Sequence, residues 1–298
     1  MSRKRKKKVS SGPDWPGKVL GLLLGPGRPL TIAVLAAGVV LVGWYFVWSK
    51  VRQRVLSSDD YLVTAAKVEI TPAPAWIHSD VRGEAFRNAS LDGPLSIMDD
   101  DLVERIGNAF SLHPWVAEVS RVGKHHPARV EIDLVYRRPV CVVEVPGDLL
   151  PVDGRGVLLP PGDFSPVEKS RYPRLTGVDT YPLSTAGEPW GDARVAGGAE
   201  IAAALAEVWE QFKLAKIVSM AGDAADEPVY TLVTRGGTRI YWGRSPGSPR
   251  PGGLTVPEKI DRLREYIAEH GNLEGRSAPQ SLDINRLRTP RISSRPKP

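Results

Sequence analysis

Residues 30–48, LTIAVLAAGVVLVGWYFVW, form an apolar stretch without one charged residue. At about 1.5 Å per residue, a helix of this length covers about 28 Å, close to the roughly 30 Å hydrocarbon layer of a bilayer. Trp44, Tyr45 and Trp48 gather near one end, where aromatic side chains suit the membrane interface. The pattern predicts one transmembrane helix, in contact with lipid over residues 30–48.

Basic residues flank this stretch unequally. The first 28 residues hold eight Lys and Arg and one acid, Asp14, whereas Lys50, Arg52 and Arg54 follow the stretch closely. Because the more basic flank usually stays in the cytoplasm, we expect the amino terminus inside and the bulk of the chain outside. A cleaved signal peptide is the alternative. It would have an apolar region of about 7–15 residues followed by small residues at the cleavage site. Here the apolar stretch ends in bulky residues, Trp44 to Trp48, which favours an uncleaved anchor.

Beyond residue 70 the hydrophobic pattern predicts a small first domain. Residues 116–122 and 129–136 alternate between apolar and polar, as strands with one buried face do. Apolar residues spaced by three and four predict a helix over 100–110, with Asp99, Asp100 and Asp101 placed to cap it. A short strand is predicted at 76–81, and residues 49–70 are interpreted as a connector.

A second domain is predicted from residue 140 to 286. Helical spacing over 199–214 and 257–270 predicts two helices, and residues 287–298 are interpreted as a basic, flexible tail. The fold class expected for the exported part is therefore α+β, with a β-α-β-β domain followed by a mixed β domain with two or more helices. The strands predicted in the second domain are 140–145, 149–152, 157–159, 216–220, 229–234, 238–242 and 281–286.

Charge and candidate chemistry favour an interaction protein over an enzyme. Residues 29–298 carry 32 basic and 33 acidic groups, so the basic tail accounts for the pI of 9.4 and a nucleic-acid-binding body is not expected. Gly243–Gly247 has the spacing of a serine-hydrolase elbow, but Pro246 lacks the N–H that an oxyanion hole needs. The five histidines lack zinc-site spacing, and Cys141 is expected to be buried and inert. We expect no catalytic residue, metal, cofactor or small-molecule substrate.

Several short motifs occur in a fixed order along the exported part. They are His113-Pro114-Trp115-Val116; His126-Pro127 before a strand; Arg137-Arg138-Pro139-Val140; Asp153-Gly154-Arg155-Gly156; Tyr172-Pro173-Arg174-Leu175-Thr176-Gly177; Ile240–Gly243; and Leu282-Asp283-Ile284-Asn285-Arg286. In this order the chain resembles the FtsQ/DivIB family of bacterial cell-division membrane proteins. It departs from the family pattern at Tyr136, Cys141 and Asn285, where Glu, Ala and an uninterrupted Asp-Leu-Arg motif are usual.

The resemblance implies a domain organisation and a role. It implies a cytoplasmic tail (1–29), a transmembrane helix (30–48), a connector (49–70), a POTRA domain (71–139) and a β domain (140–286). The protein would be a single-pass type II protein of the bacterial inner membrane, with its bulk in the periplasm, at the division septum. It would be a non-enzymatic scaffold that recruits small bitopic proteins similar to FtsB and FtsL. The residues so implicated are the POTRA motif His113, Pro114, Trp115 and Val116, and the domain junction Arg137, Pro139, Asp153 and Gly154.

Partner binding is expected at the last strand of the β domain. An exposed strand edge presents unpaired N–H and C=O groups to which a partner strand can add. The residues assigned to this role are Ser281, Leu282, Asp283, Ile284, Asn285 and Arg286, with Leu287, Arg288 and Ile292 nearby. The other interpretation, that Leu282 and Ile284 only fill the core, stays open for their side chains.

Two alternatives to the scaffold make different demands on the sequence. A membrane-anchored cell-wall hydrolase would need paired acids in a cleft. Glu207 with Glu210, or Asp261 with Glu265, have helical spacing but lie on polar helix faces. An outer-membrane transporter would need many alternating strands of about ten residues, which this sequence lacks.

Overall fold

The structure is a computed structural model, which describes residues 28–56, 59–222, 227–271, 273, 279–285 and 291–293. The chain divides into two units, residues 1–62 and 63–298. The larger unit holds two hydrophobic cores, which define a first domain and a second domain. The α+β class is confirmed, with mixed sheets and helices following an amino-terminal apolar helix.

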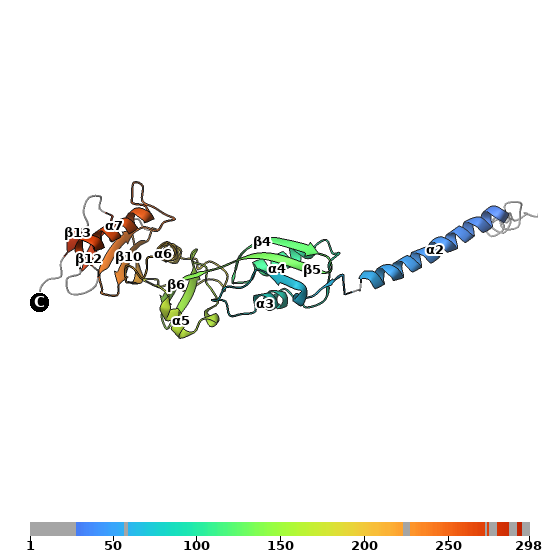
Figure 1. The fold of residues 1–298 in the computed structure, drawn as a ribbon, viewed down its shortest axis with the longest axis horizontal. Coiled ribbons are helices and arrows are strands. Elements are labelled where there is room, and N and C mark those ends of the chain that lie inside the picture. Colours follow the sequence, from blue (N-terminus) through green and yellow to red (C-terminus); the bar gives the residue numbers. More distant parts are fainter. Residues whose placement is uncertain are drawn as a thin grey trace, which may run out of the picture. The chain divides into compact units, whose positions relative to one another are not determined.

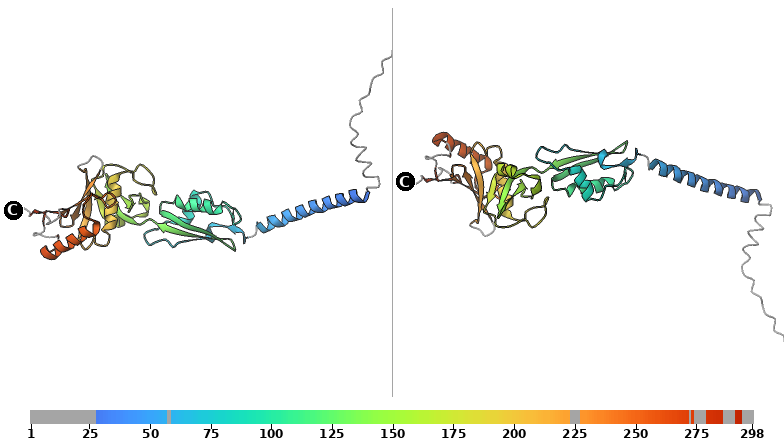
Figure 2. Two further views of the ribbon diagram at one scale, coloured as in Figure 1. Left: turned by 90° about the horizontal axis from the view of Figure 1, so that it is seen from above. Right: turned by 90° about the horizontal axis from the view of Figure 1, so that it is seen from below.

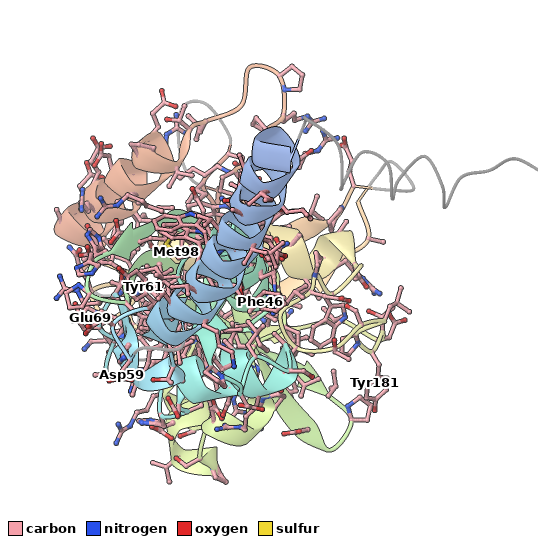
Figure 3. The ribbon with its side chains drawn as sticks, turned by 90° about the vertical axis from the view of Figure 1, so that its right-hand side faces the viewer. Phe46, Asp59, Tyr61, Glu69, Met98 and Tyr181 are labelled. Carbon is pink, nitrogen blue, oxygen red and sulfur yellow. The ribbon has the colours of Figure 1, made fainter. Side chains whose placement is uncertain are left out.

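Helix α2 (Arg28–Leu56) contains the predicted apolar segment. Its window Ile32–Arg52 is long and apolar enough to cross a membrane, and none of that window is buried within the protein. Figure 3 shows Phe46 among the side chains of this helix, and 61% of Phe46 is exposed. The helix continues past Trp48 to Leu56, so the connector expected from residue 49 begins later. The basic tail lies outside the described residues up to residue 27.

The first domain is a three-stranded sheet with two helices (Figure 1). Strand β5 is central, parallel to β2 and antiparallel to β4, and α4 packs on β4. A small second sheet pairs β1 with β3. The elements are β1 (Leu62–Val63), η1 (Ala65–Lys67), β2 (Val68–Ile70), α3 (Val81–Asn88), β3 (Leu95–Ser96), α4 (Leu102–Ser111), β4 (Val116–His125) and β5 (Arg129–Tyr136).

Three sequence predictions for this domain need correction. Val63 and Val68 are fully buried in its core, so the domain starts near Val63 and not at residue 71. The strand expected at 76–81 is absent there, and Asp80 instead accepts a hydrogen bond from Gly83 N and caps α3. The helix expected at 100–110 is confirmed as α4, but its N-cap residue, Asp101, makes no side-chain capping bond.

The second domain contains one mixed sheet in the order β13-β12-β11-β10-β9-β8-β6-β7. Strands β6, β8 and β9 run parallel, as do β11 and β12, and the other neighbours are antiparallel. Helices α6 and α7 flank this sheet (Figures 1 and 2). The elements are β6 (Pro139–Val145), β7 (Asp148–Asp153), η2 (Pro161–Asp163), α5 (Pro166–Arg171), β8 (Arg174–Thr176), α6 (Ala193–Ala204), β9 (Leu214–Met220), β10 (Val229–Thr234), β11 (Arg239–Gly243), α7 (Val256–His270), β12 (Ser281–Asp283) and β13 (Arg291–Ser293).

The second domain differs from the sequence prediction at four places. β8 lies between β6 and β9 in a segment where no strand was predicted. Residues 157–159 form only isolated bridges, not a strand. Helix α6 begins at Ala193 and ends at Ala204, earlier than the predicted 199–214, because Asp192 caps its start through Arg194 N. A strand, β13, lies in the predicted flexible tail.

Candidate partner-binding edge and domain joint

Strand β12, the predicted partner-binding strand, is not at the edge of the sheet. It pairs with β11 on one side and with β13 on the other, through Ser281–Ser293, Leu282–Ile292 and Asp283–Arg291. The expectation that this is the last strand is therefore wrong, because the chain's own tail occupies its outer side. The outermost strand among the described residues at this end is β13, only three residues long.

The side chains of β12 and the two residues after it have unequal environments. Leu282 and Ile284 are buried in the core of the second domain. Ser281, Asp283 and Asn285 are half-buried. Asn285 donates from Nδ2 to the carbonyl oxygens of Tyr241 and Trp242, both at 2.9 Å, and thereby fixes the end of β12 to β11.

Some residues assigned to this site lie beyond the strand. Arg286, Leu287 and Arg288 are outside the described residues, and the strand ends at Asp283 rather than at 286. Ile284 follows β12, and its carbonyl oxygen accepts a hydrogen bond from Arg262 Nη1 at 3.0 Å. Partner binding at this edge stays a prediction, because side chains alone do not identify the strand that would add to it.

The residues predicted at the domain junction meet at a joint between the two domains. Arg137, just after β5, donates from Nη1 to Asp153 Oδ2 at 2.9 Å, and both side chains are largely buried. Asp153 Oδ1 also accepts the N–H groups of Arg155 and Val157. Pro139 opens β6 opposite Asp153, and Gly154 lies against Ala203. The carboxylate of Asp153 thus holds the turn after β7 and the end of β5 together.

The His113–Val116 motif forms a second part of the joint. Trp115 is fully buried and donates from Nε1 to Asp163 Oδ2 at 2.7 Å, across the domain boundary. Leu159 and Phe164, from the second domain's sequence, belong to the first domain's core. The two domains therefore share one packed boundary, which sequence patterns alone did not indicate.

Two neighbours of Trp115 complete this part of the joint. His113 is buried beside Glu84 at 3.2 Å, and burial lowers its pKa despite the opposing effect of that carboxylate. A Cβ at Gly187, where φ is +98°, would lie 2.9 Å from the Cα of Pro114. The loop carrying Gly187 can therefore approach Pro114 only because this position has no side chain.

The acids considered for a hydrolase do not converge in a cleft. Glu210 is exposed and pairs with Arg235, and Asp261 is exposed and pairs with Arg264. Ser245 follows β11 in a loop and has no histidine partner in the part of the chain that the structure describes. Within the same residues, no group of three His, Cys, Asp or Glu could hold a metal ion.

Comparisons with known proteins leave this arrangement without a family assignment. A comparison with models of known protein families found no match, and a comparison with curated proteins found none either.

Proposed function

We propose that this protein is a non-enzymatic, membrane-anchored scaffold of the bacterial cell-division complex, of the FtsQ/DivIB kind. Helix α2 anchors it in the inner membrane, with its amino terminus in the cytoplasm. The first domain is a POTRA domain, and the second is the β domain that captures small bitopic division proteins at the septum. This role requires neither a bound small molecule nor a catalytic residue.

One observation carries the proposal: the sheet of the second domain ends at its carboxy-terminal side on a three-residue strand. A three-residue strand is held in place by few backbone hydrogen bonds, so a partner strand can compete with β13 for its position beside β12. In the proposed mechanism a partner strand replaces β13 and pairs with β12, as β13 does now in antiparallel register. The binding energy comes mainly from backbone pairing.

The short joint between the domains supports the same role. A scaffold that binds a partner through its second domain benefits when that domain is held in a fixed position relative to the first domain. The contacts of Arg137 with Asp153 and of Trp115 with Asp163 provide such fixation between the two domains.

The proposal is tested by tagging the full chain in its host and isolating bound proteins. We expect a mid-cell ring and co-purification of small proteins with one transmembrane helix each. Two substitutions locate the capture site: Ile284→Pro removes the backbone N–H of the residue that directly follows β12, whereas Ile284→Ala keeps it and removes buried side-chain volume. Capture lost in the proline variant and kept in the alanine variant supports strand addition. Uniform distribution of the tagged protein, or capture unaffected by proline, contradicts it.

A further inference from the structure

A groove of about 850 Å³ lies in the second domain, between the end of the β10–β11 hairpin and the start of α7. Its walls come from β10, β11, the loop after Gly243 and the first turn of α7. This volume is within the roughly 300–1,000 Å³ range of pockets that bind small ligands. The lining includes Thr231, Trp242, Arg250, Val256 and Lys259.

Lys259 is a buried cation without a carboxylate partner among the described residues. Its ammonium nitrogen donates to the carbonyl oxygen of Trp242 at 2.8 Å and lies 4.6 Å from the centre of that indole ring. An ammonium group has three N–H donors, and the structure assigns one of them a partner. Burial lowers the pKa of Lys259 to about 8, and no neighbouring acid opposes this effect.

Two further buried groups that line the groove have no partner. The indole N–H of Trp242, a fully buried residue, makes no hydrogen bond, and neither does the hydroxyl of Thr231. Buried polar groups are rarely left unpaired, because such a group has lost its hydration without gaining a hydrogen bond. Both atoms are enclosed by the protein, so the donor offered to a ligand is the ammonium of Lys259.

The charges of the groove leave cations in excess. Three cations, Arg244, Arg250 and Lys259, line it with two acids, Glu227 and Asp283, an excess of one positive charge, and Glu227 pairs with Arg244. Arg250 is exposed, and its guanidinium has no partner in the described part of the chain. Lys259 and Arg250 are therefore the cations available to an incoming anion, against the single carboxylate of Asp283, and beside them lies an apolar wall that includes Leu254 and Val256.

We propose that this groove binds the carboxylate of a peptide whose adjacent side chain is apolar. Lys259 Nζ donates to the carboxylate, and the apolar side chain packs on Val256 and Leu254. A phosphate fits less well, because phosphate sites use free N–H groups at a helix start. At α7 the Glu258 carboxylate already accepts the Thr255 N–H, at 2.7 Å. This site does not depend on strand addition at β12, so each proposal can fail separately.

The test uses the full chain in detergent micelles, labelled with 5-fluorotryptophan. The Trp242 fluorine signal is assigned by its absence in Trp242→Phe. Two matched pairs of probes are titrated: N-acetyl-leucine with N-acetyl-leucinamide, and acetyl-Leu-Glu-Leu-amide with acetyl-Leu-Gln-Leu-amide. We expect a saturable shift of the Trp242 signal with a carboxylate probe and at least a tenfold weaker response with its neutral counterpart. The first pair reports a chain terminus and the second an acidic side chain.

Two lysine variants make the test specific. Lys259→Met keeps a long apolar side chain in the groove, and we expect it to abolish the shift. Lys216→Met removes the same charge from an exposed position on β9, and we expect the wild-type response. The remaining tryptophan signals show that each variant is folded. Equal responses to charged and neutral probes, no response to either acid, or an unchanged response in folded Lys259→Met would overturn the proposal.

Discussion

Arg137 and Asp153 form an ion pair of 2.9 Å across the joint of the two domains, with side-chain exposures of 14% and 8%. The pair belongs to a network, because Asp153 also holds two backbone N–H groups and Arg137 Nη2 donates to the carbonyl oxygen of Gly187. A buried pair is costly to break, since the charge left behind has no water to solvate it.

Replacing Arg137 with Met should therefore destabilise the protein by about 3–5 kcal/mol, the usual cost of removing one partner of a buried pair. Chemical denaturation of the full chain, followed by far-UV circular dichroism, measures this free energy of unfolding. The matched control is Arg235→Met, which breaks the exposed pair with Glu210 and should change the free energy by less than about 1 kcal/mol. Equal effects of the two substitutions would mean that the joint contributes no more than a surface contact.

The lowered pKa of Lys259 predicts a pH dependence of stability. The folded protein holds this proton with a pKa of about 8, against 10.5 as the ordinary value, so the unfolded state binds more protons between these values. The free energy of unfolding should therefore rise with pH from about 8 to 10, by up to about 3 kcal/mol. Thermal unfolding at stepped pH, for the wild type and for Lys259→Met, isolates this contribution as their difference.

The pH range must stop at about 10 because of the tyrosines. Burial raises the pKa of Tyr136, Tyr172, Tyr230 and Tyr266, so their contribution to stability is lost as the pH rises above the ordinary value of 10. A wild-type curve that stays parallel to that of Lys259→Met between pH 8 and 10 would show that Lys259 does not titrate in the folded state as the structure indicates.

Removing residues 287–298 should strengthen partner capture. If β13 occupies the position of the partner strand, its removal leaves β12 free, and the apparent affinity should increase about three- to tenfold, or roughly 0.7–1.4 kcal/mol. Binding of a purified partner to the full and the shortened chain measures this change. Weaker capture by the shortened chain would mean that a partner adds outside β13 instead of replacing it.

The proposed membrane orientation predicts which cysteines react from outside the cell. Cys141 is fully buried, and burial raises its pKa to about 12, so it should not react with a maleimide in the folded protein. Leu183 is 88% exposed. We expect Leu183→Cys, but not the wild type, to react with a membrane-impermeant maleimide on intact spheroplasts. Labelling that requires permeabilised membranes would reverse the orientation.

Gly177 is required by a close backbone contact. Its φ is +82°, and a Cβ there would lie 2.2 Å from the carbonyl oxygen of Ser219. Gly177→Ala should lower the free energy of unfolding by about 2 kcal/mol or more, from backbone strain and displacement of β9. Gly162→Ala is the control, because a Cβ at Gly162 meets no atom within 4 Å. Chemical denaturation compares the two, and similar stabilities would contradict the contact.

Regular local patterns were predicted well from the sequence. The strands at 129–136 and 229–234 are confirmed to the residue as β5 and β10. The helix at 257–270 is confirmed as α7, which starts one residue earlier behind the Thr255–Glu258 capping box. Side-chain periodicity and helix capping depend on residues that are close together in the sequence, so these patterns predict elements that are also present in the folded chain.

Elements whose formation depends on distant partners were missed. β8 has three residues next to a proline, and it is a strand because β6 and β9 pair with it on both sides. β13 likewise exists only by pairing with β12. The groove was not predicted because Lys259 and Trp242 lie on different elements, and their surroundings give no local motif.

The sequence by itself determined the uncharged helix, the basic flank before it, and the alternating strands, since these depend on neighbouring residues along the chain. Only the tertiary structure decided that Leu159 and Phe164 complete the first domain's core, that β12 has a neighbour on both sides, and that Lys259 is buried against Trp242. Strand order and burial arise from contacts between residues far apart in the sequence, so they depend on the packing of the whole domain.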